Sequence, residues 1–226
     1  MDIVDFHSHI LPALDHGSSS VDTSLSQLRL ASNHGIKRVV ATSHYYPYRE
    51  NPDRFIGRRA RCYDALISAR TEDMPDVVLG AEVLICDNIE EMPLLDRLCI
   101  GGTRALLLEL PFTDFSKSHY ISIKSLIREG YDVILAHADR YDPDNINALV
   151  NLGAKIQLNV DSLCGLFIKR HLLKWIEAGS VVALGSDIHG PDNKAYVRFE
   201  KAIKKLGGRA EIIKINSDKY WSVFEK

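Results

Sequence analysis

Seven short apolar runs alternate with amphipathic segments along this 226-residue chain, and this alternation limits its possible folds more than any other feature. The runs have the length of buried strands, and the amphipathic segments have the length of helices. A strand followed by a helix, repeated, predicts parallel strands joined by right-handed helical crossovers. The runs are 2–6, 37–42, 77–81, 104–108, 132–136, 155–160 and 181–186. The amphipathic segments are 22–33, 53–70, 88–98, 119–128, 143–151, 163–177 and 193–206.

The spacing of these units predicts an α/β barrel. Seven units of about 30 residues each fit the length of a βαβ repeat, whereas eight would be cramped. We therefore expect one domain over residues 1–226, built as an imperfectly closed seven-stranded barrel, (β/α)7. The tail, residues 209–226, contains Tyr220 and Phe224, and we expect it to pack on the outside of the barrel without a catalytic role.

Composition and charge exclude several classes of protein. A net charge of −2 with interspersed signs gives no broad electropositive face, so nucleic acid is not an expected partner. No stretch approaches the roughly 18 consecutive apolar residues of a membrane span, so we expect no membrane insertion and a cytoplasmic location. The four cysteines form no C-x-x-C pair, which favours reduced thiols over a disulfide framework.

Metal-type ligands stand at or just past the ends of six of the seven runs. The carboxyl ends of all strands of a parallel barrel meet at one face, so these residues predict a multinuclear metal site there. Nitrogen and oxygen donors without a thiolate suit Mn, Fe or Zn in a hydrolytic rather than a structural site. The residues are His7, His9, His44, Glu82, Glu109, His137, Asp187 and His189.

Each of these residues also has an ordinary explanation when taken alone. A histidine at a strand end can simply pack, and a buried carboxylate such as Glu82 can be held by an arginine. Such coincidences at so many strand ends are much less probable than one metal site. The loop 11–17 adds two further donors, Asp15 and His16.

The motifs that carry these residues run in a fixed order over almost the whole chain, and they resemble those of the PHP (polymerase and histidinol phosphatase) superfamily. Within it the chain is most similar to the manganese-dependent bacterial protein-tyrosine phosphatases of capsular and exopolysaccharide systems. The motifs are Asp5-Phe6-His7-Ser8-His9-Ile10-Leu11-Pro12, Asp15-His16-Gly17, Ala41-Thr42-Ser43-His44, Gly80-Ala81-Glu82, Leu108-Glu109, His137-Ala138-Asp139-Arg140-Tyr141 and Ser186-Asp187-Ile188-His189.

The resemblance implies a distorted seven-stranded barrel with three divalent metal ions, Mn first, with Fe or Zn as alternatives. It assigns His7, His9, Glu82 and Asp187 to the first ion, and Glu82, Glu109 and His137 to the second. His16, His44 and His189 would hold the third.

Two departures from the family pattern concern the loops around this site. The phosphatase branch usually carries Asp-Asp-Gly where this chain has Asp15-His16-Gly17, but other PHP members place a histidine ligand in this loop. The branch also carries an arginine followed by prolines after the Ser-Asp-x-His motif. Here Lys194 is the expected substitute for that positive charge, as a point donor without the arginine fork.

The expected activity is phosphomonoester hydrolysis, most simply of protein phosphotyrosine, by attack of a metal-bound hydroxide. Arg140 would hold the phosphate and neutralise the charge on its oxygens. Asp15 is the candidate acid, although a phenol leaving group needs little protonation. Tyr45 and Tyr46, with Tyr48 beside them, would stack on the substrate ring, or else pack only against one another.

Three alternatives stay open from the sequence. One is a small-molecule phosphatase such as histidinol-phosphate phosphatase, and another is a catalytically silent metal-binding regulator. The third is a thiol phosphatase, because Cys164 and Arg170 match C-x5-R, but the residues between them are too bulky for a phosphate cradle. The resemblance implies that the partner is a phosphotyrosine protein, the tail of a polysaccharide-assembly tyrosine kinase.

Overall fold

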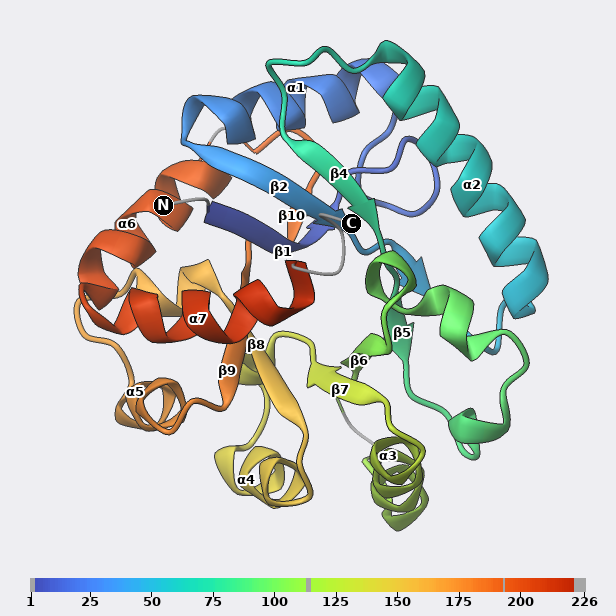
Figure 1. Cartoon of the computed structure of the whole chain (residues 1–226), viewed down its shortest axis with the longest axis vertical. Helices are drawn as coiled ribbons and strands as arrows, with labels where there is room; N and C mark the ends of the chain where they lie inside the picture. The colour runs from blue at the N-terminus through green and yellow to red at the C-terminus, as the bar shows by residue number, and fades with distance from the viewer. Residues whose placement is uncertain (1–2, 113–114, 193, 222–226) are drawn as a thin grey trace.

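The fold is an α/β arrangement of parallel strands surrounded by helices (Figure 1). The computed structural model describes residues 3–112, 115–192 and 194–221, so Asp2, Asn193 and Phe224 of the predicted elements lie outside the described residues. The strands are β1 (Ile3–His9), β2 (Ile36–Ala41), β3 (His44–Tyr45), β4 (Asp76–Leu79), β5 (Glu82–Leu84), β6 (Ala105–Glu109), β7 (Asp132–Leu135), β8 (Lys155–Asn159), β9 (Val181–Gly185) and β10 (Ile188–His189). The helices are α1 (Val21–Asn33), α2 (Pro52–Ala69), α3 (Lys117–Arg128), α4 (Pro143–Asn151), α5 (Arg170–Glu177), α6 (Ala195–Leu206) and α7 (Arg209–Trp221).

Strand pairing forms two parallel sheets rather than one closed sheet within the described residues. Their orders are β10-β1-β2-β4 and β3-β5-β6-β7-β8-β9. The breaks fall between β2 and β3, between β4 and β5, and between β9 and β10. Single hydrogen bonds continue across them: the amide of Asp187 donates to the His7 carbonyl at 2.8 Å, and the amide of Thr42 donates to the Ser8 carbonyl at 2.9 Å. Three of the predicted ligands, His44, Glu82 and Asp187, therefore lie at or beside these breaks.

Two of the predicted helices are much shorter than the sequence indicates. Segment 88–98 forms only two 3₁₀ turns, Ile89–Glu91 and Leu95–Leu98. Asn88 and Leu94 have left-handed backbones that interrupt an α-helix, and Pro93 between the two turns cannot donate a helical hydrogen bond. Segment 163–177 becomes helical only at Arg170, after a 3₁₀ turn at Val160–Leu163.

Buried apolar side chains form two separate layers, one on each side of the strands. The larger layer lies between the strands and the helices, which Figure 1 shows around the outer side of the strands. The smaller layer includes Phe6, Val40, Leu107 and Ile134 from four different strands. It also includes Tyr220 from α7, whose ring meets Phe6 edge-on at a centroid distance of 5.9 Å. Helix α7 packs against β9, α5 and α6, in agreement with a tail on the outside of the strands, and its Tyr220 in addition reaches the smaller layer.

Among the described residues, no helix is both long enough and apolar enough to cross a membrane. All four cysteines are free thiols. The fold thus brings the carboxyl ends of β1, β6, β7 and β10 and the starts of β3 and β5 around one site.

Candidate metal centre

The centre begins at the end of β1, where two imidazoles alternate with a serine. Successive side chains of a strand point to opposite faces, so His7 and His9 share one face while Ser8 faces away. The Ser8 hydroxyl donates to the Val40 carbonyl at 2.8 Å in the neighbouring strand. The Nε2 atoms of His7 and His9 lie 3.2 Å apart, and both rings are buried.

Glu82, the first residue of β5, lies at the middle of the cluster and is fully buried. Its carboxylate lies within 3.3 Å of the ring nitrogens of four histidines. The distances are 3.2 Å to His7, 3.3 Å to His9, 2.9 Å to His44 and 2.7 Å to His137. A carboxylate shared by four imidazoles from β1, β3 and the end of β7 is placed as a bridging ligand.

Two further carboxylates complete the cluster. Asp187 Oδ1 lies 3.3 Å from His9 Nε2 and 3.6 Å from His7 Nε2. Glu109 Oε2 lies 3.7 Å from His44 Nδ1. Among the described residues, the ion-pair partners of Glu82 and Glu109 are imidazoles, so the alternative of an arginine-held carboxylate does not describe them.

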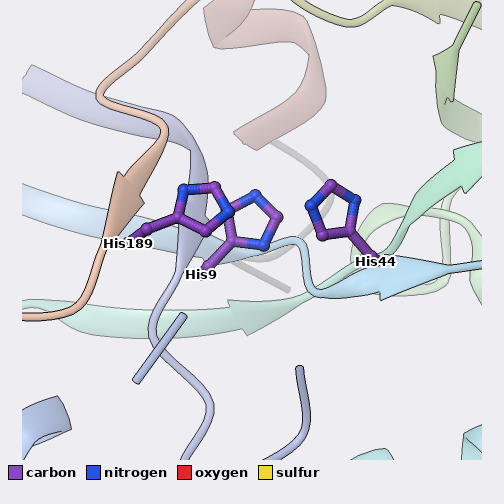
Figure 2. Close-up of side chains that lie close together, drawn as sticks. All are labelled: His9, His44 and His189. Atoms are coloured by element: carbon purple, nitrogen blue, oxygen red, sulfur yellow. The ribbon is translucent and has the colours of Figure 1, made fainter. Parts of the chain in front are cut away.

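Three imidazoles from different parts of the chain, His9, His44 and His189, lie close together (Figure 2). The ring centroid of His9 lies 3.9 Å from that of His189 and 4.5 Å from that of His44. His16, more exposed, stacks beside them at 4.5 Å from His189 and 4.9 Å from His44. The structure thus brings together all nine residues that the sequence indicated as metal ligands.

The donors fall into three overlapping groups that could each hold a cation. These are His7, His9 and Glu82; His44, Glu82 and Glu109; and His9, His44 and His189. The groups overlap with the ligand sets implied by the resemblance. His137 lies 2.7 Å from Glu82 and 3.9 Å from Glu109, and His44 lies 2.9 and 3.7 Å from the same two carboxylates. Buried donor atoms that make no hydrogen bond within the described residues support the fit: Glu82 Oε2, Glu109 Oε2, His44 Nδ1, His137 Nδ1 and His189 Nε2.

Three histidines are held in the tautomer that a metal requires. His7 Nδ1 donates to the side-chain carbonyl of Gln157 at 3.0 Å, and His9 Nδ1 donates to Asp15 Oδ2 at 2.9 Å. His189 Nδ1 donates to the Asp187 carbonyl at 2.9 Å. A proton on Nδ1 leaves the Nε2 lone pair free, which is the form that binds a cation.

The electrostatics of the cluster favour added positive charge. Burial lowers the pKa of His7, but the carboxylates of Glu82 and Asp187 outweigh burial and raise that pKa to about 9. Burial and the nearby Glu82 carboxylate raise the pKa of Glu109 to about 7. Burial and the neighbouring His9 together lower the pKa of His189 to about 4. Repulsion between two carboxylates is relieved by a cation between them, so the donor set fits divalent metal ions.

The backbone of the site is unusually constrained at two ligands. His137 and Asp187 have positive φ angles of 33° and 52°, a left-handed conformation that costs non-glycine residues free energy. Gly185 allows the close approach of a neighbouring ligand, since a Cβ there would lie 2.4 Å from the His7 Cβ. Local strain and close packing of this kind cluster at functional sites.

Two amides on β8 were not predicted from the sequence, and the run 155–160 that became β8 is the one predicted run without a ligand at its end. Gln157 Oε1 accepts from His7 Nδ1 at 3.0 Å and from the His137 amide at 2.6 Å, and its Nε2 donates to Asn159 Oδ1 at 2.9 Å. Asn159 Nδ2 then donates to Asp187 Oδ2 at 2.9 Å. This β8 amide pair, Gln157 and Asn159, therefore connects three ligands. The available signal was two amides at alternate positions inside an apolar strand.

Asp15 and Asp5 hold the ligands in place from opposite sides. Asp15 accepts from His9 Nδ1 and from the backbone amides of Gly17 and His44, at 2.9 to 3.0 Å. Burial would raise the pKa of Asp15, but the bonds from His9 and the two amides lower it well below its usual range. Asp15 therefore has no proton to donate at neutral pH, and the geometry does not support the predicted acid role. Asp5, fully buried, accepts from the Ser186 amide at 2.8 Å.

Of the four residues predicted to contact substrate, Arg140 and Tyr46 line the cavity at the metal centre, whereas Tyr45 and Lys194 do not. Arg140 Nη2 donates to Asp187 Oδ2 at 2.5 Å and lines a cavity of about 360 Å³ over the centre. Tyr46 lines the same cavity and stacks on His44 at 5.1 Å. Tyr45 does not reach the site: it is 1% exposed and belongs to the core, because alternate residues of β3 face opposite ways. Lys194 is exposed at the start of α6 and is not among the residues described as lining that cavity.

Comparison with known proteins places this geometry in a family. Residues 3–216 match the family described as "Capsular polysaccharide synthesis, CpsB/CapC". The chain belongs to the CpsB/CapC family. The tyrosine-protein phosphatase YwqE of Bacillus subtilis is 30% identical over 206 residues, covering 86% of this chain and 80% of that protein. The putative tyrosine-protein phosphatase CapC of Staphylococcus aureus is 26% identical over 205 residues, covering 86% and 80%.

Solved structures agree with membership in the CpsB/CapC family. A structure described with YwqE from Bacillus subtilis and CpsB from Streptococcus pneumoniae as "unique metal-dependent tyrosine phosphatases" matches with a TM-score of 0.78 and 25% identity. The match covers 96% of this chain and 93% of that one. A TatD-family hydrolase of Entamoeba histolytica shares the fold alone, with a TM-score of 0.57 and 10% identity.

Proposed function

We propose that this CpsB/CapC-family chain is a metal-dependent protein-tyrosine phosphatase. The observation that carries the proposal is the convergence of histidines and carboxylates around Glu82, with the Arg140 guanidinium at the same cavity. Related proteins of this family are named tyrosine-protein phosphatases, and a matching solved structure is described as metal-dependent. A phosphomonoester is the substrate class for which clustered cations and an arginine are suited.

The metal content is part of the proposal: three divalent ions, with Mn²⁺ first and Fe or Zn as alternatives. His7, His9, Glu82 and Asp187 would hold the first ion, and Glu82 and Glu109 with His137 or His44 would hold the second. His16, His44 and His189 would hold the third. Bound divalent ions activate water at neutral pH and polarise phosphoryl oxygens.

The protein's own side chains bind and orient the substrate. Arg140, whose side chain is 42% exposed, can turn its free guanidinium edge to the phosphate while keeping its bond to Asp187. Tyr46 on His44 forms one aromatic wall. Phe112, 66% exposed and nearly parallel to the His137 ring at 6.4 Å, forms another. Two such walls suit a phosphotyrosyl ring.

Proton transfer in this proposal needs no strong protein acid. A phenol has a pKa of about 10, lower than that of an aliphatic alcohol, so a phenolate leaves more readily than an alkoxide. Asp15 stays ionised and acts as a positioning residue, because it fixes the His9 tautomer and binds the His44 amide. The β8 amide pair acts in the same way on His7 and Asp187.

We extend the proposal to the fold, the partner and the location. Counting each interrupted strand as one gives seven segments in cyclic order, which supports a distorted seven-stranded barrel. The partner we propose is a phosphotyrosine protein of polysaccharide assembly, the tail of its tyrosine kinase, and the location is the cytoplasm. Free thiols at all four cysteines suit a reducing compartment.

A chelate-and-reconstitute assay tests the function. The purified chain is stripped with a chelator and assayed on a phosphotyrosine peptide after addition of Mn²⁺, Zn²⁺, Mg²⁺ or Fe²⁺ in parallel. We expect activity to be lost on stripping and restored by one of these ions. Preferential turnover of histidinol phosphate would favour the small-molecule phosphatase, and full metal occupancy without hydrolysis of any aryl phosphate would favour the silent regulator.

A further inference from the structure

A second polar cavity, about 520 Å³ in volume, adjoins the metal centre on the side of α2. It shares His16, His44 and Tyr46 with the cavity over the metals, so the two form one continuous hollow. The remaining residues that line it are Leu14, Asp15, Arg49, Glu50, Arg54 and Arg58. A substrate bound at the metals would therefore place its neighbouring residues beside three arginines.

The two carboxylates of this cavity are already engaged. Asp15 is bound to His9 and to two backbone amides. Glu50 is bound by Arg58, whose Nη1 donates to Glu50 Oε1 at 2.5 Å and whose Nη2 donates to the Leu14 carbonyl at 2.7 Å. Arg58 is thus neutralised and fixed in place.

The other two arginines keep their positive charge available. Arg54 touches Glu50 only at 3.9 Å and is otherwise exposed. Among the described residues, Arg49 has no carboxylate within ion-pair distance, and its guanidinium lies over the rings of Tyr46 and Tyr48 at 4.7 and 5.5 Å. Stacking on aromatic rings holds a guanidinium in one orientation while leaving its N–H edge free for an anion.

We propose that Arg49 and Arg54 form an anionic subsite that selects phosphotyrosine peptides with a second negative group beside the phosphotyrosine. This inference rests on the proposed phosphatase function and names its substrate class. The second group is either a carboxylate of Asp or Glu or a second phosphate, since both match the guanidinium fork. An extended chain advances about 3.3 Å per residue, so residues one to three positions from the phosphotyrosine lie about 3 to 10 Å from it along the chain.

Binding of non-hydrolysable peptides to the Mn²⁺-loaded protein tests the subsite. Each peptide carries a difluoromethylphosphonate analogue of phosphotyrosine, flanked at one to three residues on either side by Glu, by a second analogue, or by Gln. We expect the Glu or second-analogue peptide to bind at least about fivefold more tightly than the Gln peptide, since each of the two exposed arginines can contribute up to about fivefold. Whichever of the two binds more tightly identifies the second group as carboxylate or phosphate.

Arg49→Ala and Arg54→Ala should each reduce this preference by about fivefold, and added salt should weaken it. Arg29→Ala, an exposed arginine on α1 outside both cavities, is the matched control and should keep the preference. Equal binding of the Glu and Gln peptides, or an undiminished preference in both variants, would reject the subsite alone. Failure of every peptide to bind, together with no hydrolysis of p-nitrophenyl phosphate, would reject the phosphatase function itself.

Discussion

Replacing Gln157 by leucine tests whether the β8 amide pair holds the metal ligands in place. The change keeps the volume roughly constant but removes the partners of His7 Nδ1, the His137 amide and Asn159 Oδ1, all of which are buried. A buried group left without its partner costs about 1 to 3 kcal/mol. Three such groups at the lower figure predict a loss of about 3 kcal/mol in the free energy of unfolding. Loss of the bond that fixes the His7 tautomer should also weaken metal binding by about 10- to 100-fold.

Urea unfolding of the metal-stripped protein and calorimetric titration with Mn²⁺ measure the two effects separately. Gln27→Leu is the matched control, because Gln27 is also buried but its amide atoms have no hydrogen-bond partner within the described residues. The control should be neutral or slightly stabilising. If Gln157→Leu unfolds like Gln27→Leu and binds Mn²⁺ within twofold of the unaltered protein, the positioning role of β8 is incorrect.

Three further predictions concern single side chains. In steady-state assays, Arg140→Ala should lower kcat/KM for an aryl phosphate by about 100-fold. Arg140→Lys should retain only part of the kcat/KM of the unaltered protein, because lysine lacks the guanidinium fork. Cys164→Ser should leave activity unchanged and iodoacetamide should not inhibit, because burial raises the pKa of the Cys164 thiol and disfavours the thiolate; inactivation by either treatment would revive the thiol mechanism. Gly185→Ala should lower the free energy of unfolding by about 1 to 3 kcal/mol and weaken Mn²⁺ binding, because its Cβ would meet the His7 Cβ at 2.4 Å. Gly208 has open space around it, so Gly208→Ala is the control and should leave thermal unfolding unchanged.

The arrangement of the ligands was predictable because parallel strands bring their carboxyl ends to one face. His7 and Asp187 lie far apart in sequence, yet their neighbouring strands β1 and β10 pair in parallel. The same rule of alternation explains one error. In the run His44-Tyr45-Tyr46, the first and third side chains face the site and the second faces the core, so Tyr45 could have been excluded from the sequence alone.

Other features depend on tertiary contacts that local patterns do not contain. The apolar run containing Gln157 predicted the strand β8 correctly, but which amide meets which ligand depends on the register between β7, β8 and β9. The left-handed backbones at Asn88 and Leu94 have no glycine to signal them, so segment 88–98 resembled a helix. Tyr220 of α7 joins the smaller apolar layer beside Phe6, a contact that the hydrophobicity of the tail does not specify.

The pairing of β1 with β10 has a consequence for how the protein acquires its ions. His9 near the start of the chain and His189 near its end stack at 3.9 Å, so one cation would touch both. During synthesis the early strands leave the ribosome long before β10 exists, and until then this pocket lacks one wall. If the proposed ion binds between His9 and His189, its complete ligand set would exist only in molecules whose translation has passed residue 189.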